Sequence, residues 1–341
     1  MLFRSRGDPL WGRMGSIQTI HNMAYQGPHA GGWLFDVGVP GCNHPDLIYQ
    51  DKADNLMAIS VVYSDIVSTV SPRYAVEMQY PRFGEGLDTL MRMRARSGDV
   101  VGILNGIDPE LWNPATDKSL PYKFDANTFL AGRAANKAQM QVDAGLPVNP
   151  TVPLIGMVSR LTDQKGIDLA LPALRQLLSD TECQLIVLGT GEPSLEAQLR
   201  LLAEDFGWKA RAYLQFNALI SQRIYSAADL FLMPSRYEPC GTSQMIAMHY
   251  GSLPIVRETG GLADTVENYD GESADRGTGF VFSWEEISAV SNTLRWAIST
   301  YRDRPEAFRR MQQRAMRVDF SWKKSASEYV SMYERTLTRH R

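Results

Sequence analysis

From about Thr151 onward, short apolar runs alternate with helical segments, and this alternation restricts the fold more than any other feature of the chain. Short apolar runs bounded by turn residues predict buried strands. We expect such strands at Val152–Val158, Gln184–Leu188, Ala212–Phe216, Leu230–Met233, Pro254–Val256 and Gly279–Phe282. Because strand, helix and strand follow one another, the sequence predicts βαβ units and an α/β fold with a doubly wound parallel sheet.

The helices expected between these strands carry their apolar residues on one face. A helix that begins near Gly166 carries four leucines at helical spacing, which are Leu171, Leu174, Leu177 and Leu178. The next helix carries Leu195, Leu199, Leu202 and Phe206 in the same way. Shorter helices are expected at Ser221–Ser226 and Thr242–Tyr250. One-sided helices of this kind cover the faces of a parallel sheet.

The chain before this region has fewer such units. Its clearest strands are Ile66–Val70 and Val100–Ile103, which predict part of a second α/β domain. At the far end, Ser321 can cap a helix whose apolar face we expect to hold Trp322, Ala326, Tyr329, Val330, Tyr333 and Leu337. Residues 1–16 contain arginines but no apolar stretch typical of a signal peptide, and we expect them to form an unstructured leader.

Composition excludes several classes of protein. Among 341 residues, Lys+Arg 35 against Asp+Glu 38 give a net charge of -3, and 44% are hydrophobic. This apolar content argues against disorder, and the missing basic excess argues against a nucleic-acid partner. No apolar run is long enough to cross a bilayer, so no membrane partner is expected. Three widely spaced cysteines fit neither a disulfide framework nor a zinc site, which predicts a reducing, cytoplasmic setting and no metal.

Residues with chemical potential gather where predicted strands meet helices. Ligands of parallel sheets bind beyond the carboxyl ends of strands, so these junctions are the expected site. The stretch 159–166 carries Arg160 and Lys165 before a helix N-terminus, a combination that favours an anion such as phosphate. The alternative, a solvated loop with two surface cations, is equally compatible with the charge pattern.

A second junction, 235–244, carries Glu238, Cys240 and Gly241. The glycine allows a ligand to approach the backbone closely, and the amides at the next helix start can hold sugar hydroxyls or phosphate. The alternative makes Glu238 an acid at the start of a helix and Cys240 a small buried hydrophobic residue, which is the favoured interpretation of the cysteine.

Two glycine turns give weaker indications. The turn at 259–264, with Gly260 and Gly261, can cradle phosphate, although helix-capping turns look similar. The turn at 189–193 lacks the third glycine of a dinucleotide-binding fingerprint. A lone histidine, His21, follows the apolar run Ile17–Ile20, and such a residue is more often structural than catalytic.

Seven motifs stand in series along the chain. They are HNMAYQG at 21–27, TVSPRY at 69–74, ILNGID at 103–108, VSRLTDQKG at 158–166, PSRYEPCG at 234–241, RETGGLADTV at 257–266 and DFSW at 319–322. In this order and spacing, they resemble the bacterial glycogen synthases and plant starch synthases, glycosyltransferase family five. The resemblance covers nearly all of the chain after residue 16 and implies a GT-B fold of two Rossmann-like domains.

The resemblance implies retaining transfer of glucose from ADP-glucose to the non-reducing end of an α-1,4-glucan, such as glycogen or a maltooligosaccharide. By motif position, Arg160 and Lys165 would hold the donor diphosphate and stabilise departing ADP, and Glu238 would contact the glucose hydroxyls. His21 and Asn105 would line the glucose site from the first domain. Two cations facing a departing diphosphate stabilise the charge that grows in the transition state, so no cofactor or metal is expected.

The remaining residues of the implied donor site lie in the same motifs. Phe216 is similar to the family aromatic that stacks on adenine. The other nucleotide-binding positions are Cys240, Gly241, Thr242, Thr259, Gly260 and Gly261. The resemblance suggests a partial N-terminal, acceptor-side domain at 17–106 and a C-terminal donor domain at 107–316. The segment 317–341 would then form a helix that crosses back to the first domain.

The chain departs from the family pattern in two places. The Lys-Thr-Gly-Gly-Leu loop and the His-Asp-Trp-His-like stretch do not occur, so roughly 140 residues, about one domain, are expected to be missing before residue 17. Thr242 stands where the family commonly has leucine. Two alternatives stay open: another retaining GT-B transferase that uses UDP-glucose, or a catalytically silent fragment that binds ADP or glucan.

Overall fold

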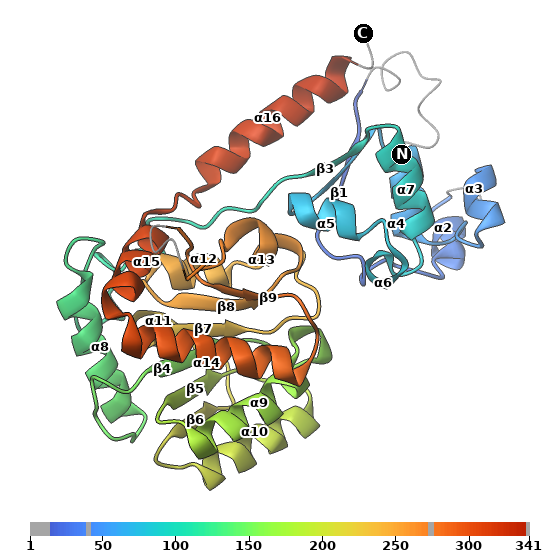
Figure 1. The fold of residues 1–341 in the computed structure, drawn as a ribbon. Coiled ribbons are helices and arrows are strands. Elements are labelled where there is room, and N and C mark those ends of the chain that lie inside the picture. The colour runs from blue at the N-terminus through green and yellow to red at the C-terminus, as the bar shows by residue number, and fades with distance from the viewer. Residues whose placement is uncertain (1–13, 39–41, 272–275, 339–341) are drawn as a thin grey trace. The chain divides into compact units, whose positions relative to one another are not determined.

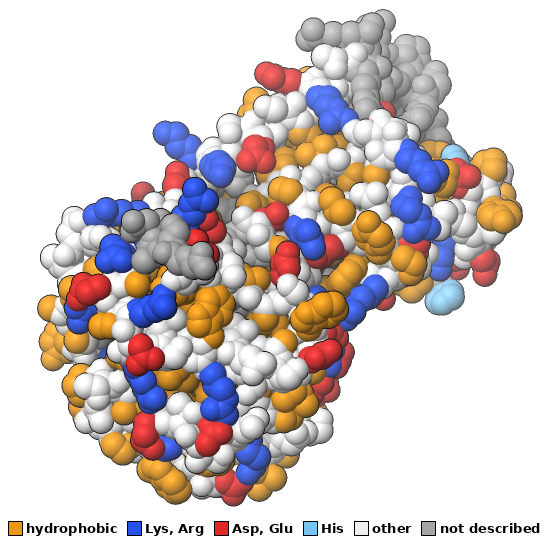
Figure 2. Space-filling view, in the orientation of Figure 1, with side chains coloured by type: hydrophobic (Ala, Val, Ile, Leu, Met, Phe, Trp, Pro, Cys, Tyr) orange, Lys and Arg blue, Asp and Glu red, His pale blue; other side chains and the backbone are white. Residues whose placement is uncertain are grey.

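The structure, a computed structural model, describes residues 14–38, 42–271 and 276–338. The chain divides into two compact units (Figure 1). One comprises the chain up to Asn105 together with the segment from Trp322 onward, and the other comprises Gly106–Ser321. Figure 2 shows Lys, Arg, Asp and Glu side chains interspersed on the visible face, without a stripe of one sign.

The first unit contains a parallel sheet with the strand order β1-β2-β3. Its strands are β1 (Ile17–Ile20), β2 (Ile66–Thr69) and β3 (Val100–Gly102). Its helices are α2 (Gly31–Asp36), α3 (Pro45–Tyr49), α4 (Leu56–Tyr63), α5 (Pro72–Glu77), α6 (Pro81–Gly84), α7 (Asp88–Arg96) and α16 (Trp322–Thr338). The core packs around buried Met23, Tyr74 and Leu90, and the Tyr74 hydroxyl accepts the Met23 amide at 3.1 Å.

The folded first unit includes a residue before the expected boundary at Ile17. Residues 1–13 of the expected leader lie outside the described residues. Ser16 is buried, and its backbone amide and hydroxyl both donate to Asp65 Oδ2 at 2.7 Å. This pair ties the start of β1 to the residue that precedes β2, so Ser16 belongs to the folded unit.

The C-terminal helix α16 packs on the sheet through a different face from the predicted one. Its buried residues are Ser325, Met332 and Thr336, and Met332 packs against Ile66 and Ile103. Most of the predicted face lies in solvent, with Trp322, Val330, Tyr333 and Leu337 between 46% and 54% exposed. The predicted face was therefore wrong except at Tyr329, which is partly buried and packs against the same residues as Met332. Helical periodicity locates an apolar stripe but does not show which side meets the sheet.

The second unit contains a parallel sheet with the strand order β6-β5-β4-β7-β8-β9. Its strands are β4 (Leu154–Val158), β5 (Gln184–Leu188), β6 (Ala210–Tyr213), β7 (Leu230–Met233), β8 (Leu253–Arg257) and β9 (Phe280–Phe282). In the register, Ile155 of β4 pairs with Leu185 on one side and with Leu230 on the other. Chain order reverses at β4, so the predicted doubly wound parallel sheet is confirmed.

Helices cover both faces of this sheet. They are α8 (Phe129–Asp143), α9 (Ile167–Asp180), α10 (Pro193–Asp205), α11 (Ala218–Ala227), α12 (Ser243–His249), α13 (Gly260–Thr265), α14 (Ile287–Asp303) and α15 (Pro305–Arg317), with a 3₁₀ turn at Asp163–Lys165. Helix α9 packs against α10 and α14, and α11 packs against α8 (Figure 1). The leucines expected to be buried in α9 and α10 are buried.

One strand differs from its expected bounds. We expected Ala212–Phe216, whereas β6 spans Ala210–Tyr213 and pairs with β5 from Ala210 onward. The strand ends at Tyr213 because Tyr213 pairs with Leu188, the last residue of β5. Further on, Asn217 caps α11, with its Oδ1 accepting the Ile220 amide at 3.0 Å. Phe216 consequently lies in the loop between β6 and α11.

Candidate active site

The loop after β4 brings a lysine to the carboxyl edge of the second sheet. Gly166 ends this loop with φ of +65°, and a Cβ there would lie 2.1 Å from the Pro234 carbonyl oxygen. No other residue type fits this position without moving the backbone. Lys165, in the preceding 3₁₀ turn, is therefore held close to the loop that follows β7.

The loop after β7 brings Glu238 to the same place. Lys165 Nζ lies 2.5 Å from Glu238 Oε2, and the Ser235 hydroxyl donates to the same oxygen at 3.0 Å. The Lys165 and Glu238 side chains are only 16% and 8% exposed. The structure thus joins two predicted site residues that are far apart in sequence, in an ion pair largely shielded from water.

A cavity of about 190 Å³ opens beside this pair. Its lining includes Arg160, Lys165, Ser159, Ser235 and Ser243. Arg160 is exposed, so its guanidinium can move onto a ligand. Two cations and several serine hydroxyls around one small cavity suit a ligand that carries both a negative charge and hydroxyl groups.

The di-glycine turn packs against the loop that carries Glu238. The Gly261 amide donates to the Glu238 carbonyl at 3.0 Å, and Thr259 just before the turn is fully buried. A Cβ on Gly260 would lie 1.9 Å from the Glu238 carbonyl oxygen, and one on Gly261 would lie 2.0 Å from that of Cys240. Both glycines are therefore required for packing these two loops together.

The other glycine turn also serves close packing. Cβ atoms on Gly189 and Gly191 would lie 2.0 Å and 2.1 Å from the carbonyl oxygens of Ser159 and Leu161. Leu161 forms an isolated parallel bridge with Gly191. This turn thus braces the loop that carries Arg160.

The remaining predicted donor-site residues differ in exposure. Cys240 is buried, at 5% exposure, as its favoured interpretation expects. Thr242 is exposed and precedes α12, while Gly241 has φ of +70° next to the Gln244 side chain. Phe216 is 92% exposed in the loop after β6. A phenyl ring so open to water offers a free face on which a flat ligand can stack.

Two predicted site residues belong to the first unit. His21 is exposed and directly follows β1, and Asn105 is half-buried shortly after β3. The strands are parallel, so both residues lie beyond the carboxyl edge of the same sheet, with β2 between their strands.

Sequence reasoning assigned no role to Arg236, which proves to hold the lysine loop in place. Its guanidinium forms two hydrogen bonds to the Asp168 carboxylate, at 2.6 and 2.7 Å, and lies 3.0 Å from Glu285. Its backbone amide donates to the Gln164 carbonyl at 2.9 Å, next to Lys165. Arg236 stands within the PSRYEPCG motif, but its partners could not be identified from spacing. Ser235, the partner of Glu238, was missed for the same reason.

The Arg236–Asp168 pair makes stability depend on pH. Hydrogen bonding to Arg236 holds the pKa of Asp168 below its ordinary range. A carboxyl whose folded-state pKa is lowered stabilises the fold above its unfolded-state pKa, and this contribution is lost as pH falls through the folded-state value. We expect Asp168→Asn to be less stable than wild type at neutral pH, with the difference shrinking as pH falls below the unfolded-state pKa of an aspartate, about 3.9. Urea unfolding at a series of pH values tests this, and a difference independent of pH would contradict it.

Two further properties concern the described residues only. They contain no group of three or more His, Cys, Asp or Glu side chains placed to hold a metal ion. None of the helices within the described ranges is both long and apolar enough to span a membrane.

Comparisons with known proteins agree with this architecture. The family described as "Glycosyl transferases group 1" matches residues 141–317, and "Starch synthase catalytic domain" matches residues 1–93. The chain is 47% identical to a glycogen synthase of Streptococcus equi subsp. equi over 94% of its length and 67% of that protein. It is 41% identical to a glycogen synthase of Thermotoga maritima, over 98% of this chain and 68% of the relative.

A solved structure shares the fold as well. The catalytic domain of starch synthase IV from Arabidopsis thaliana, bound to ADP and acarbose, superposes with a TM-score of 0.86 at 35% identity. The match covers 94% of this chain and 67% of that one. The chain thus spans about two thirds of the length of these relatives. The fold is of the GT-B glycosyltransferase type. The chain belongs to the glycogen and starch synthase family, the glycosyltransferases of glycogen and starch synthesis.

Proposed function

We propose that this chain binds ADP-glucose at the carboxyl edge of the second sheet and transfers glucose, with retention, to the non-reducing end of an α-1,4-glucan. The observation that carries this proposal is the pairing of Lys165 with Glu238 beside a cavity that Arg160 also lines. In the reaction, the bond between glucose C1 and the diphosphate oxygen breaks, and a glucan hydroxyl forms the new bond to C1. ADP leaves with the bonding electrons, and the proton of the attacking hydroxyl passes to the departing phosphate oxygen.

Arg160 and Lys165 stabilise the negative charge that grows on the leaving diphosphate. Lys165 already stands at the strand edge and is largely shielded from water, where a fixed cation acts more strongly than in solution. Exposed Arg160 supplies a planar fork that matches phosphate oxygens. Together they provide the charge for which other transferases use a metal ion.

Glu238 contacts the hydroxyls of the transferred glucose. In the structure its carboxylate accepts from Lys165 and Ser235. A phosphate that draws Lys165 toward itself leaves carboxylate lone pairs available for sugar hydroxyls. The backbone of Cys240, Gly241 and Thr242, and the turn at Thr259, Gly260 and Gly261, complete the donor site in this proposal.

Phe216 stacks on the adenine ring. We expect Phe216→Ala to weaken ADP binding about tenfold, because stacking on an aromatic side chain contributes about 1–3 kcal/mol per base. Trp208→Ala is the matched control, because Trp208 is also an exposed aromatic but precedes β6 and so lies at the opposite edge of the sheet. Calorimetric titration with ADP measures both, and an equal loss in the two variants would exclude specific stacking.

The second unit is the donor domain in this proposal, corresponding to the expected span 107–316, and residues 17–106 are the acceptor-side domain. His21 and Asn105 belong to the first unit, and their roles toward glucose remain predictions. The variants His21→Ala and Asn105→Ala test them through the rate of glucose transfer.

Cys42, Cys183 and Cys240 are buried and form no disulfide, which supports a reducing, cytoplasmic setting.

Incorporation of labelled glucose into glycogen, with ADP-glucose and UDP-glucose in parallel, tests the proposed reaction. We expect incorporation from ADP-glucose and much less from UDP-glucose. Preference for UDP-glucose would make the chain a different retaining transferase. Calorimetric ADP binding without any incorporation would instead identify a binding fragment and contradict the proposed catalysis.

A further inference from the structure

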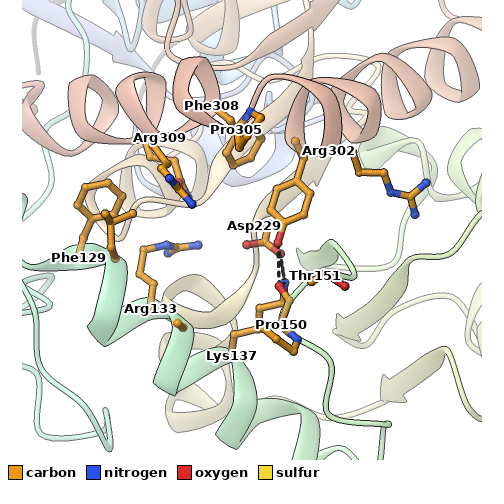
Figure 3. A pocket seen from close by; sticks show the side chains of 14 residues that line it. Phe129, Arg133, Lys137, Pro150, Thr151, Asp229, Arg302, Pro305, Phe308 and Arg309 are labelled. Carbon is orange, nitrogen blue, oxygen red and sulfur yellow. Dashed lines mark hydrogen bonds and ion pairs between the residues drawn. The ribbon is translucent and has the colours of Figure 1, made fainter.

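A second, larger cavity of about 410 Å³ lies in the second unit, at the amino ends of its strands (Figure 3). Asp229 stands directly before β7, and Pro150 and Thr151 stand shortly before β4. Helices α8, α14 and α15 form the remaining walls. The volume falls within the usual range for small-molecule sites. The proposed donor site follows the opposite ends of β4 and β7, roughly 15 Å away at about 3.3 Å per residue.

One side of the cavity is formed by the ion pair of Lys137 and Asp229, whose charges cancel. Lys137 Nζ lies 2.6 Å from Asp229 Oδ2 and also donates to the Tyr301 hydroxyl at 3.1 Å and to the Pro150 carbonyl at 3.3 Å. Its three protons therefore all have acceptors. The Asp229 carboxylate also accepts the Leu154 amide at 2.9 Å. This side offers no charge to a ligand.

Arg133 brings a second cation into the same cavity, and it is only 5% exposed. Its guanidinium donates to the carbonyls of Ser226, Ala228 and Tyr250, near the ends of α11 and α12, whose dipoles offset part of the charge. Asp229, the carboxylate in the cavity lining, is already paired with Lys137. Burial lowers the pKa of Arg133 to about 10, while the charge of nearby Asp229 acts in the opposite direction.

Arg309 on α15 adds a third positive charge. Figure 3 shows the Arg309 side chain extending from α15 toward the side of the cavity where Arg133 lies, whereas that of Arg302 points away. Arg309 pairs with Glu306 at 2.6 Å, but both side chains are about half or more exposed, so water screens this pair. Arg133 and Arg309 line the same cavity, so an anion bound between them would be attracted by two positive charges.

The walls beside these guanidiniums are apolar. Phe129 and Phe308 are 5% and 2% exposed and line the cavity, and Leu130 adds an aliphatic side chain. We propose that this cavity binds a small organic anion, with a phosphate or carboxylate group between Arg133 and Arg309 and a flat apolar body against the phenyl rings. This proposal does not rest on the proposed donor site.

Calorimetric titration with phenyl phosphate tests the proposal. Because this probe can also occupy the donor site, the titration is repeated in the Arg160→Ala variant. We expect binding to persist in Arg160→Ala and to weaken about tenfold or more in Arg309→Gln, which removes a charged hydrogen bond. Arg200→Gln is the matched control, because Arg200 is an exposed arginine on α10 outside the cavity.

Two further measurements test whether the probe binds in the cavity itself and whether its charge is needed for binding. Ala134 is exposed at the cavity wall, so Ala134→Trp fills the cavity without disturbing the buried pair and is expected to abolish binding. Benzyl alcohol, which has the ring but no charge, is expected not to bind. The proposal is overturned if Arg309→Gln binds phenyl phosphate like wild type, if Arg160→Ala abolishes all binding, or if benzyl alcohol binds equally well.

Discussion

The Lys165→Met variant is expected to transfer glucose about 100- to 1000-fold more slowly than wild type, as is typical when one preorganised group facing transition-state charge is removed. Methionine keeps most of the length of the side chain but removes the cation that lies 2.5 Å from Glu238. The loss should appear mainly in kcat, because the charge on the diphosphate grows as the bond to glucose breaks. Initial rates over a range of ADP-glucose concentrations separate kcat from KM.

Lys209→Met is the matched control for this experiment. Lys209 is similarly shielded, at 12% side-chain exposure, and pairs with Glu182 at 2.9 Å, but it directly precedes β6 at the opposite edge of the sheet. We expect its kcat to remain within about twofold of wild type, because a distant charge contributes little to the transition state. Similar kcat values for Lys165→Met and wild type would show that Lys165 holds the loop rather than the leaving group.

Replacement of Asp229 by alanine is expected to lower the free energy of unfolding of the second unit by about 3–5 kcal/mol. The variant leaves the Lys137 ammonium, at 5% side-chain exposure, without a carboxylate. It also removes the acceptor of the Leu154 amide at the start of β4. An unpaired buried charge and an unpaired buried amide each cost free energy.

Asp205→Ala tests whether burial causes this effect. Arg175 and Asp205 lie 2.6 Å apart, the same separation as Lys137 and Asp229, but their side chains are 50% and 51% exposed. We expect this variant to lose less than about 1 kcal/mol, because water screens an exposed pair. Urea unfolding followed by near-ultraviolet circular dichroism measures both, and equal losses would rule out burial as the cause.

Much of the fold could be predicted from the sequence because its elements have clear local patterns. The apolar run at Gln184–Leu188 and the leucines of α9 are recognisable from composition and spacing alone, and both lie where they were expected. The end of β6 was missed, since it depends on where its partner strand β5 ends, at Leu188. The buried face of α16 was also missed, because it depends on the contact between Met332 and residues of β2 and β3.

The candidate site could likewise be predicted from the sequence only in part. Arg160, Lys165 and Glu238 could be picked out because parallel strands place their following loops at one edge. The contact between Lys165 and Glu238 joins residues 73 positions apart, and the hydrogen bonds of Arg236 to Asp168 span 68 positions. The spacing of residues in a chain contains no information on such partners.

The sequence by itself determined the parallel sheet of the second unit, the loops that carry its cations and its family. The tertiary structure alone decided which charges are paired and which of them line the same cavity. Arg133, Asp229 and Arg309 are ordinary residues in the sequence, and they become a charged cavity only where α8, β7 and α15 meet. The physical reason is that an ionic interaction depends on distance and on exclusion of water, and both are properties of the packed molecule.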